Sequence, residues 1–557
     1  MDGHSIIRKR DALKAARNPF EGHWDELAEI FMPFRCMKDG GLPEIPAARE
    51  VFDSSPRQAA LIMANGLASL VTPREETWFE FAPPRAIRDD DQAVAWYRQC
   101  SATAREYIER SNFYEEIGEC LIEAPVFGTA ALFLGDLDDY GRLYFRCQPV
   151  KTYYITEDAA GRVNSLCREL DLTAEQAATE FGQDNLPPAV RGALGSPDKA
   201  QNATRYIHCV YRRNYQAPPA DDPGAENETG GRVWESVVVH EASGHVVARA
   251  GYHEFPFAVH RYRRFGRSAY GFGPGSVALS DARQLQFLNQ LADVATEKQV
   301  FPPVIAPSSL EGEVARGALE ITYVDPSDPN AAAMLREWST TSRYDICMDR
   351  MAAKRGQVQD IFHVPLFNLF QQRAAQHGPL TATEASLMAG EKLTQFSPVF
   401  GRLVSEMLDP VLNRVFGVLL RAGVLGAPPP SVVRAMGSRA GVAAPSLLYK
   451  NRIMLAMQQR ENANLMDFMA LVTPLLNHYP QAMDALRLPE VVRTVARNNG
   501  LPEEWLRSQE EMQAIEQARA EQADAAMQMQ QAEQAASAAQ KLSAAAPGLA
   551  DRAMSGL

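Results

Sequence analysis

The feature that most constrains the fold is a pair of helical stretches, residues 274–300 and 331–361, which flank a short β-rich segment. The first stretch has Pro274 in its first turn and an apolar stripe that stops before two consecutive prolines. The second has apolar residues near heptad spacing. Between them, residues 301–330 contain the strand-like runs VIAP and LEITYVDP, which predict a compact insert. A helix that leaves the body, carries an insert and returns is unusual in an enzyme core and typical of a stalk.

The chain before this stalk predicts a mixed body. Apolar residues at helical spacing predict helices over residues 1–33, 56–71 and about 91–122. Residues 126–270 predict strands and hairpins, because short β-branched and aromatic runs alternate with Gly, Asp and Asn, and residues 172–182 within them predict a short helix. The second helix has three candidate N-caps, Asp53, Ser54 and Ser55, and Pro56 lies in its first turn.

The chain after the stalk predicts further helices. Residues 362–380 form an irregular loop, and a capping box at residues 381–384 opens a long helix in which Pro398 and Pro410 are expected to cause kinks. Residues 450–507 are again helical. From about residue 508 to 545 the chain is rich in Ala, Gln, Glu and Met without Gly or Pro, which predicts a polar helix of roughly 50 Å.

Composition excludes several classes of protein. At 557 residues the chain exceeds a single ordinary core. Its net charge of −13 argues against tight binding to DNA phosphates, which requires a basic surface. No apolar run is long enough for a membrane helix, and the first twenty residues lack the apolar region of a signal peptide. The seven cysteines lack CxxC spacing, which favours free thiols in a reducing compartment.

Motifs for catalysis, metals and cofactors are absent from the sequence. The run from His240 to His245 has one residue too many for a zinc-protease helix, so a hairpin turn is the better interpretation. The glycine-rich run at 271–275 lacks the Lys and Ser/Thr of a phosphate-binding loop. It predicts a hinge between loop and helix, formed by Gly271, Gly273, Pro274 and Gly275. No nucleophile elbow or catalytic triad is recognisable, so we expect no enzyme, no metal and no cofactor.

Two groups of polar side chains have two interpretations. The basic residues of the second stalk helix either pair with acidic residues of neighbouring subunits or lie in solvent, or some of them face a channel in which symmetry repeats each charge around DNA. The same alternatives hold for polar residues of the following loop. The candidates are Arg336, Arg343, Arg350, Lys354 and Arg355 on the helix, and Gln371, Gln372, Arg373 and His377 on the loop.

Several strings, in this order, resemble the head-to-tail connecting (portal) family of podoviruses. The resemblance covers residues 8–505, and the order and spacing of the strings make it specific. They are Trp24 to Pro33, VFDSS at 51–55, ANGL at 64–67, LVTP at 70–73, TWF at 77–79, YGFGP at 270–274, TATE at 381–384, FGR at 400–402 and EMLDP at 406–410.

The resemblance implies an α+β, mostly helical portal fold that assembles as a ring of about twelve subunits. Its regions would be the wing (1–273), two stem helices (274–300 and 331–361) around the clip (301–330), the channel loop (362–380), the long kinked wing helix and its connection (381–449), the crown (450–507) and a C-terminal helix that forms a barrel or stays disordered (508–557).

The same resemblance implies a passive DNA conduit at one capsid vertex, assembled in the host cytoplasm. Its partners would be the double-stranded DNA in the channel, the large terminase subunit, the major capsid and scaffolding proteins, and the tail adaptor and internal ejection proteins, with no membrane. Two alternatives are an enzyme whose site is built from dispersed residues and another virion connector or adaptor without a channel role. The length and the stalk argue against the adaptor.

Overall fold

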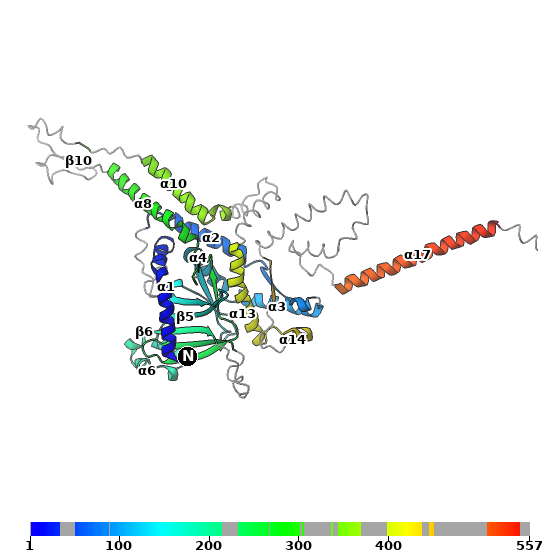
Figure 1. Cartoon of the computed structure of the whole chain (residues 1–557), viewed down its shortest axis with the longest axis horizontal. Coiled ribbons are helices and arrows are strands. Elements are labelled where there is room, and N and C mark those ends of the chain that lie inside the picture. The colour runs from blue at the N-terminus through cyan, green and yellow to red at the C-terminus, as the bar shows by residue number, and fades with distance from the viewer. Residues whose placement is uncertain are drawn as a thin grey trace, which may run out of the picture. The chain divides into compact units, whose positions relative to one another are not determined.

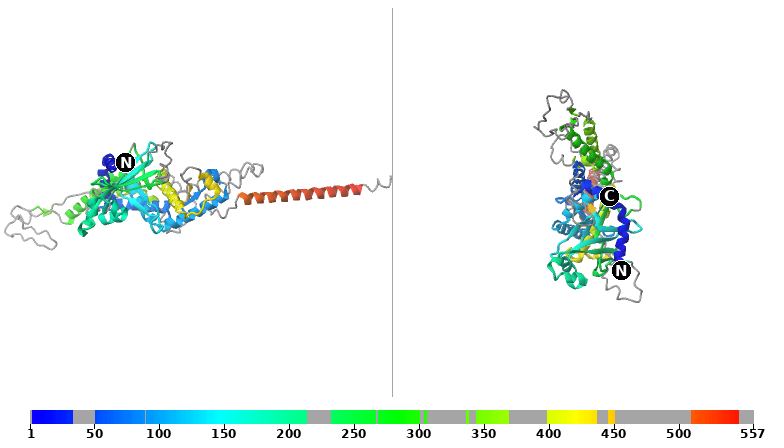
Figure 2. Two further views of the ribbon diagram at one scale, coloured as in Figure 1. Left: turned by 90° about the horizontal axis from the view of Figure 1, so that it is seen from below. Right: turned by 90° about the vertical axis from the view of Figure 1, so that its left-hand side faces the viewer.

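The computed structural model describes residues 2–33, 51–88, 90–213, 232–266, 268–300, 304–305, 336–337, 344–368, 398–436, 445–450 and 509–545. The chain divides into two units, residues 1–457 and 458–557, and each is described by itself. In the first unit helices pack around antiparallel sheets, and α8 and α10 extend side by side from this body (Figures 1 and 2). The expected mixed α+β class with a helical majority is confirmed.

The two N-terminal helices form where the apolar spacing predicts them. Helix α1 spans Gly3–Phe31 and is capped by Asp2, whose carboxylate accepts a hydrogen bond from the Ser5 amide. Helix α2 spans Ser55–Val71. Its predicted apolar face is buried in the main core and consists of Ala59, Met63, Leu67 and Leu70.

The single helical segment expected at about 91–122 is wrong, because it is two helices, α3 (Asp91–Glu109) and α4 (Phe113–Phe127). The break lies at residues 110–112. The Asn112 side chain accepts a hydrogen bond from the Phe145 amide and donates one to the Phe145 carbonyl, at 2.9 and 2.8 Å. Asn112 is the N-cap of α4, a position where asparagine is favoured, and its side chain ties the start of this helix to β3. Gly128, at φ +80°, then ends α4 in the left-handed conformation.

The region expected to form strands contains two antiparallel sheets. The smaller has the order β3-β2-β9, and the larger has the order β4-β5-β6-β7-β8. Their strands are β2 (Thr129–Leu134), β3 (Phe145–Gln148), β4 (Tyr153–Glu157), β5 (Val163–Thr173), β6 (Ala203–Arg212), β7 (Trp234–His240), β8 (Val246–Tyr252) and β9 (Phe257–Arg261). The turn after His240 joins β7 to β8, so the predicted hairpin is confirmed.

Each face of the larger sheet is covered by a different part of the chain. On one face α1 inserts Ile6 among Cys167, Cys209 and Val239. On the other face Leu166 and Val210 join the main core. Short helices lie in the β5–β6 connection and pack near Tyr206: α5 (Ala174–Phe181), which has the predicted end at Gly182, α6 (Pro188–Ala193) and α7 (Pro197–Ala200). Short 3-10 turns are η3 (Arg85–Ile87), η4 (Val150–Thr152) and η5 (Gln183–Asn185).

The stalk consists of α8 (Pro274–Val300) and α10 (Tyr344–Ile361). The predicted first helix is confirmed, whereas the second, expected over 331–361, is wrong at its start. Residues Arg336–Glu337 form strand β11, which pairs antiparallel with β10 (Val304–Ile305). A backbone that exchanges ladder hydrogen bonds with another strand cannot at the same time make helical ones.

The C-terminal part of the first unit returns to the core. A π-helical segment, η7 (Val404–Leu408), leads into α13 (Asp409–Arg421), and α14 spans Pro430–Met436. Strand β12 (Ser446–Tyr449) pairs antiparallel with β1 (Phe79–Ala82). Apolar side chains at helical spacing in this part are buried, namely Phe400, Leu403, Met407, Val411, Val415 and Leu419.

In the second unit the structure describes one helix, α17 (Gln509–Ala545). The predicted polar helix is therefore confirmed in extent, and its described side chains are mostly exposed. The helix predicted over 450–507 lies outside the described residues.

Candidate functional site

The stalk helices pack on each other through a short apolar seam. Leu285 and Ala292 of α8 meet Met351 of α10, and Leu288 and Cys347 border them. Much of each helix is exposed, so the apolar contact between them is narrow for helices of this length. Apolar packing alone therefore gives the stalk limited support, and polar contacts at its base matter more.

Asp53 fastens the base of the stalk to the body. Its carboxylate, 3% exposed, accepts a hydrogen bond from the Arg355 guanidinium at 2.8 Å and one from the Asn289 amide at 3.0 Å. Gln286 closes the cluster, since it donates to the Asp53 carbonyl at 2.7 Å and accepts from the Asp53 amide at 2.9 Å. Asp53, two residues before the start of α2, thus joins α8 and α10.

The charge of Asp53 depends on this cluster. Burial opposes ionisation of its carboxyl group, but hydrogen bonds from Ser55 and the ion pair with Arg355 outweigh burial and lower its pKa below the ordinary value of 3.8. The Ser55 amide donates to the carboxylate at 2.7 Å, so this carboxylate also caps the start of α2. Asp53 is therefore ionised at neutral pH and paired.

The predicted channel residues on α10 differ in their surroundings. Arg355 pairs with Asp53, and Lys354 pairs with Asp281 of α8 at 2.7 Å. Both cations are thus paired inside their own chain, an arrangement that neither interpretation of the sequence included. Their role in a channel stays a prediction. Arg350 is exposed. Arg336 lies in β11, whereas Arg343 and the loop candidates Gln371, Gln372, Arg373 and His377 lie outside the described residues.

The glycines at the start of α8 make room for neighbouring backbone. A Cβ on Gly271 would lie 2.3 Å from the Gly128 carbonyl oxygen, and one on Gly273 would lie 2.1 Å from the Pro125 carbonyl oxygen. A Cβ on Gly275 would lie 2.6 Å from the Val126 carbonyl oxygen, and Pro274 is buried in the first turn of α8. The run packs against the end of α4, and this close packing leaves no room for a side chain at the three glycine positions. Its predicted role as a hinge remains a prediction.

The two predicted kink positions lie at different places in the helical C-terminal part. Pro410 is near the start of α13, directly after η7. Because Pro410 has no amide proton and its ring collides with the carbonyl four residues earlier, a π-helical segment here is physically expected. Pro398 is exposed at the first residue of the described range 398–436. The kinks themselves remain predictions.

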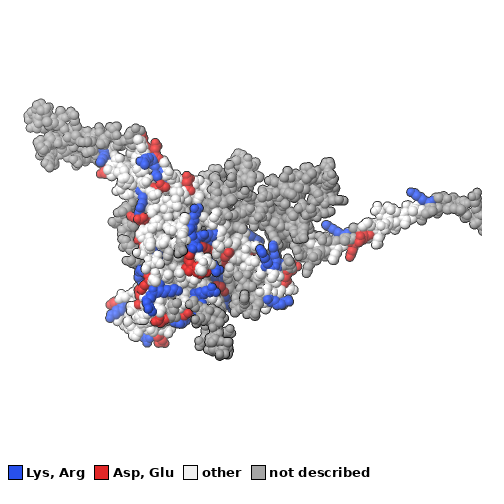
Figure 3. Space-filling view, in the orientation of Figure 1, with Lys and Arg blue, Asp and Glu red and all other residues white. Residues whose placement is uncertain are grey.

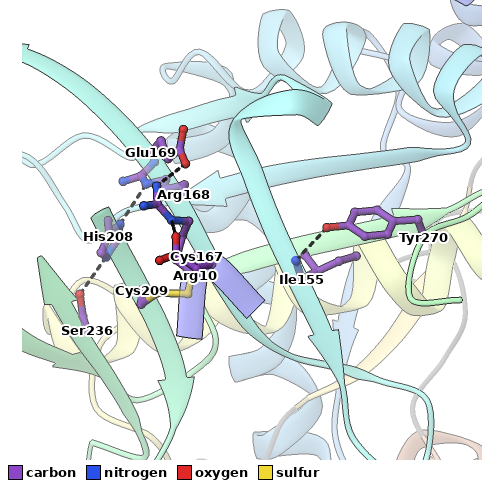
Figure 4. Close-up of a disulfide and its surroundings, with 10 residues drawn as sticks. Arg10, Ile155, Cys167, Arg168, Glu169, His208, Cys209, Ser236 and Tyr270 are labelled. Atoms are coloured by element: carbon purple, nitrogen blue, oxygen red, sulfur yellow. Dashed lines mark hydrogen bonds and ion pairs between the residues drawn. A yellow bond between two sulfur atoms is a disulfide. The ribbon is translucent and has the colours of Figure 1, made fainter. Parts of the chain in front are cut away.

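A disulfide joins Cys167 and Cys209, which lie directly opposite each other on β5 and β6 (Figure 4). The expectation of free thiols is therefore wrong for this pair, because strand register brings together residues that lie 42 positions apart. Among the described cysteines, Cys100, Cys120, Cys147 and Cys347 are thiols. Burial raises the pKa of the Cys100 thiol to about 12, which makes it a poor nucleophile.

On the opposite face of β5 and β6, Arg168 is buried beside His208, and the two side chains do not form a catalytic arrangement (Figure 4). Arg168 donates to Nδ1 of His208 at 2.9 Å and lies over the Phe133 ring. Burial and then the Arg168 charge hold the pKa of His208 well below its usual range, so its imidazole is neutral. Since Nδ1 accepts from Arg168, Nε2 carries the proton and donates to Ser236 at 2.9 Å. His208 is thus a structural link between strands.

The disulfide itself is testable. Denatured, unreduced protein should titrate two fewer thiols than the seven cysteines of the sequence, and all seven should react after treatment with dithiothreitol. Peptide mapping should find Cys167 and Cys209 in one linked pair. Seven reactive thiols before reduction would contradict the disulfide.

The described residues contain no constellation that suggests catalysis or metal binding. They include no group of three or more His, Cys, Asp or Glu side chains able to hold a metal ion. A cavity of about 330 Å³ beside Trp24 contains Glu116 and Lys151, but these groups bind the Cys147 amide and Asp25. On the face in Figure 3, acidic and basic side chains are interspersed and do not gather into a basic surface. None of the helices in the described ranges is long and apolar enough to span a membrane.

Comparison with known proteins decides the family. The sequence profile described as "Bacteriophage head to tail connecting protein" matches residues 4–506, nearly the whole chain. The chain belongs to this family. Two curated proteins are similar along their length: the portal protein of Salmonella phage epsilon15, 24% identical over 539 residues, and the probable portal protein of Bordetella phage BPP-1, 25% identical over 534 residues. Each alignment covers 93% of this chain and 91% of the relative.

Family membership confirms the main functional prediction. The chain is a phage portal protein, the connector between head and tail at the portal vertex of the virion, and it has a structural role without enzymatic activity. The alternative of an enzyme built from dispersed residues is therefore wrong. Membership of this family implies an oligomeric ring that connects capsid and tail. The stalk cluster around Asp53 was missed from the sequence, where Asp53 was read only as a possible helix cap.

Proposed function

We propose that this portal protein forms a ring of about twelve subunits through which double-stranded DNA enters and leaves the capsid. The observation that carries the proposal is the family match over residues 4–506, in a chain whose α8 and α10 project from a mixed body. In this proposal residues 1–273 and 381–449 form the wing, 274–300 and 331–361 the stem, 301–330 the clip, 362–380 the channel loop, 450–507 the crown, and 508–557 a terminal helical region.

The proposed ring guides DNA and does not grip it. The net charge of −13 per chain repels phosphates, and ion pairs with Asp281 and Asp53 occupy Lys354 and Arg355. Weak contacts repeated by symmetry, from Arg350 and the loop residues 371–377, keep the duplex centred without holding it. The clip docks the terminase motor during packaging and the tail adaptor afterwards. Capsid, scaffolding and internal ejection proteins contact the outer regions.

Electron microscopy of the purified full-length chain tests the ring. Negative-stain class averages, computed without imposed symmetry, should show rings with a central opening. Particles that remain monomeric over a range of concentrations and salt would contradict the proposal, and closed rings without an opening would favour a connector without a channel role.

Arg350 provides a separate test of the channel. Replacing it by glutamate should leave folding unchanged within about 0.5 kcal/mol, because the side chain is exposed. In the ring the substitution repeats around the channel, so we expect the DNA packaged per particle to fall at least about tenfold. Quantitative PCR of nuclease-protected DNA measures this effect. The matched control is Arg110→Glu, at an exposed position directly after α3. Normal packaging by the Arg350 variant would contradict a role for Arg350 in the channel. It would not contradict the proposed ring.

A further inference from the structure

Two thiols of the body lie against each other where α4 meets the smaller sheet. The Cys120 sulfur, on α4, lies 3.1 Å from the Cys147 sulfur, on β3. Both side chains are thiols in the structure. A disulfide brings its sulfur atoms to about 2.05 Å, so the two side chains need to approach by only about 1 Å. The pair is therefore already placed for a second disulfide.

The backbone on both sides of this pair is held in place. Cys147 lies opposite Leu132 in the ladder between β3 and β2, and its amide donates to the Glu116 carboxylate at 2.6 Å. Glu116 lies about one helical turn before Cys120 on α4. The same helix thus binds the Cys147 backbone and presents a thiol to the Cys147 side chain. This arrangement fixes the distance between the two sulfur atoms.

A cavity gives one of the two thiols access to small molecules. Cys147 is partly exposed and lines the cavity of about 330 Å³ beside Trp24, whereas Cys120 is 1% exposed. Acidic side chains outnumber basic ones in the lining, so a bulky anionic oxidant is disfavoured and a small uncharged one, such as hydrogen peroxide, is favoured. The charged lining residues are Glu116, Glu119, Glu123, Arg146 and Lys151.

The redox surroundings of a virion protein change during its lifetime. The chain is synthesised inside a cell, where glutathione and thioredoxin keep thiols reduced. The portal vertex then leaves the cell within the virion, and these reducing systems stay behind. A thiol pair at 3.1 Å with access through a cavity is therefore reduced during folding and exposed to oxidants after release.

We propose that Cys120 and Cys147 form a redox-sensitive site, which hydrogen peroxide converts to a disulfide in the released virion. Cys147 reacts first, because it lines the cavity. Its sulfur, after loss of the thiol proton, attacks one peroxide oxygen, the O–O bond breaks, and water leaves behind a sulfenic acid. The Cys120 sulfur then attacks the Cys147 sulfur, the S–O bond breaks, and a second water leaves. The two sulfurs lose two electrons, which reduce one peroxide to two water molecules.

The new bond strengthens the part of the body on which the stalk rests. Gly273 and Gly275, at the start of α8, pack against the Pro125 and Val126 carbonyls of α4. A disulfide between α4 and β3 holds this helix to the sheet. It also closes a loop between residues 27 positions apart, which lowers the entropy of the unfolded chain.

Peptide mapping tests the site. The full-length chain is purified with Cys36→Ser, so that this cysteine, outside the described residues, cannot exchange. It is treated with hydrogen peroxide, its remaining thiols are alkylated in denaturant, and it is digested without reduction. Most chains should yield a peptide pair that links Cys120 to Cys147 and that dithiothreitol separates. Cys100, which is 0% exposed, is the internal control and should be recovered alkylated.

The matched variant is Cys147→Ser, which removes the thiol that lines the cavity. After the same peroxide treatment, Cys120 in this variant should be recovered alkylated, because its own access is blocked. Hydrogen exchange provides a readout beyond the linkage itself. Peroxide should slow exchange in α4 and β3 of the chain with both thiols by at least about fivefold, and should leave exchange in the Cys147→Ser variant unchanged.

Each outcome decides a separate part of the proposal. A Cys120–Cys147 peptide pair together with slower exchange in α4 supports the site and its effect. Cys147 recovered as sulfinic or sulfonic acid beside alkylated Cys120, or linked to a different cysteine, overturns the site. A linked pair without slower exchange overturns the strengthened support of the stalk. The proposed ring does not depend on any of these results.

Discussion

Replacing Arg261 by methionine will lower the free energy of unfolding by about 3–5 kcal/mol. Arg261 ends strand β9 and its side chain is 2% exposed. Its guanidinium pairs with Glu157 and with Glu406, the latter at 2.6 Å, and donates to the Gly161 carbonyl at 3.0 Å. Methionine fills a similar volume but leaves the Glu406 carboxylate without this cation and leaves Glu157 with Arg264 as its remaining ion-pair partner. The loss of the Arg261 charge between two largely buried carboxylates is the reason for the large effect.

Urea denaturation followed by circular dichroism measures this loss. Arg110→Met is the matched control, because Arg110 at the C-terminal end of α3 forms an exposed pair with Glu106 of that helix. Its removal should cost less than about 0.5 kcal/mol. Equal stabilities of the two variants would contradict the role of Arg261. Because Glu406 lies in η7, the same ion pairs hold the C-terminal helical part against the strands.

The elements that could be predicted from sequence are those whose signal is local. The apolar spacing around Met63 predicts α2, and Pro274 with the leucine stripe predicts α8, because both depend on side chains within a few turns. The break at Asn112 could not be predicted, since its partner Phe145 lies on a distant strand. Two further contacts could not be predicted for the same reason, because their partners lie far apart in the sequence. They are the pairing of β10 with β11 and the disulfide between Cys167 and Cys209.

The candidate site shows the same division. Basic residues on the second stalk helix can be read from the sequence, but their partners cannot. Nothing in the sequence distinguishes Lys354 and Arg355 from Arg350. In the structure Lys354 pairs with Asp281 and Arg355 with Asp53, whereas Arg350 is exposed. Conversely, Asp53 looks like an ordinary helix cap. Its second role, which is to accept hydrogen bonds from α8 and α10, depends on the tertiary fold.

Replacing Asp53 by asparagine should lower the free energy of unfolding by about 2–4 kcal/mol at neutral pH. The asparagine side chain has no negative charge to pair with Arg355. Its NH₂ group can also point at the Arg355 and Asn289 side chains, which now donate hydrogen bonds to the Asp53 carboxylate. Hydrogen exchange should localise the effect, with faster exchange in α8 and α10 and little change in the five-stranded sheet. Asp349→Asn on the exposed side of α10 is the control and should change stability by less than about 0.5 kcal/mol.

The effect should also depend on pH in a defined direction. Because the folded-state pKa of Asp53 lies below its ordinary value of 3.8, its contribution is complete above that value and is lost as the pH falls through the folded-state pKa. The stability difference between the unmodified chain and the Asp53→Asn variant should therefore be constant from pH 7 down to about 5 and shrink in stronger acid. A double-mutant cycle with Arg355→Met should give a coupling of about 1–3 kcal/mol at pH 7 that decreases in the same acid range. A pH-independent difference, or a coupling near zero, would mean that the stalk is held by its apolar seam and not by this ion pair.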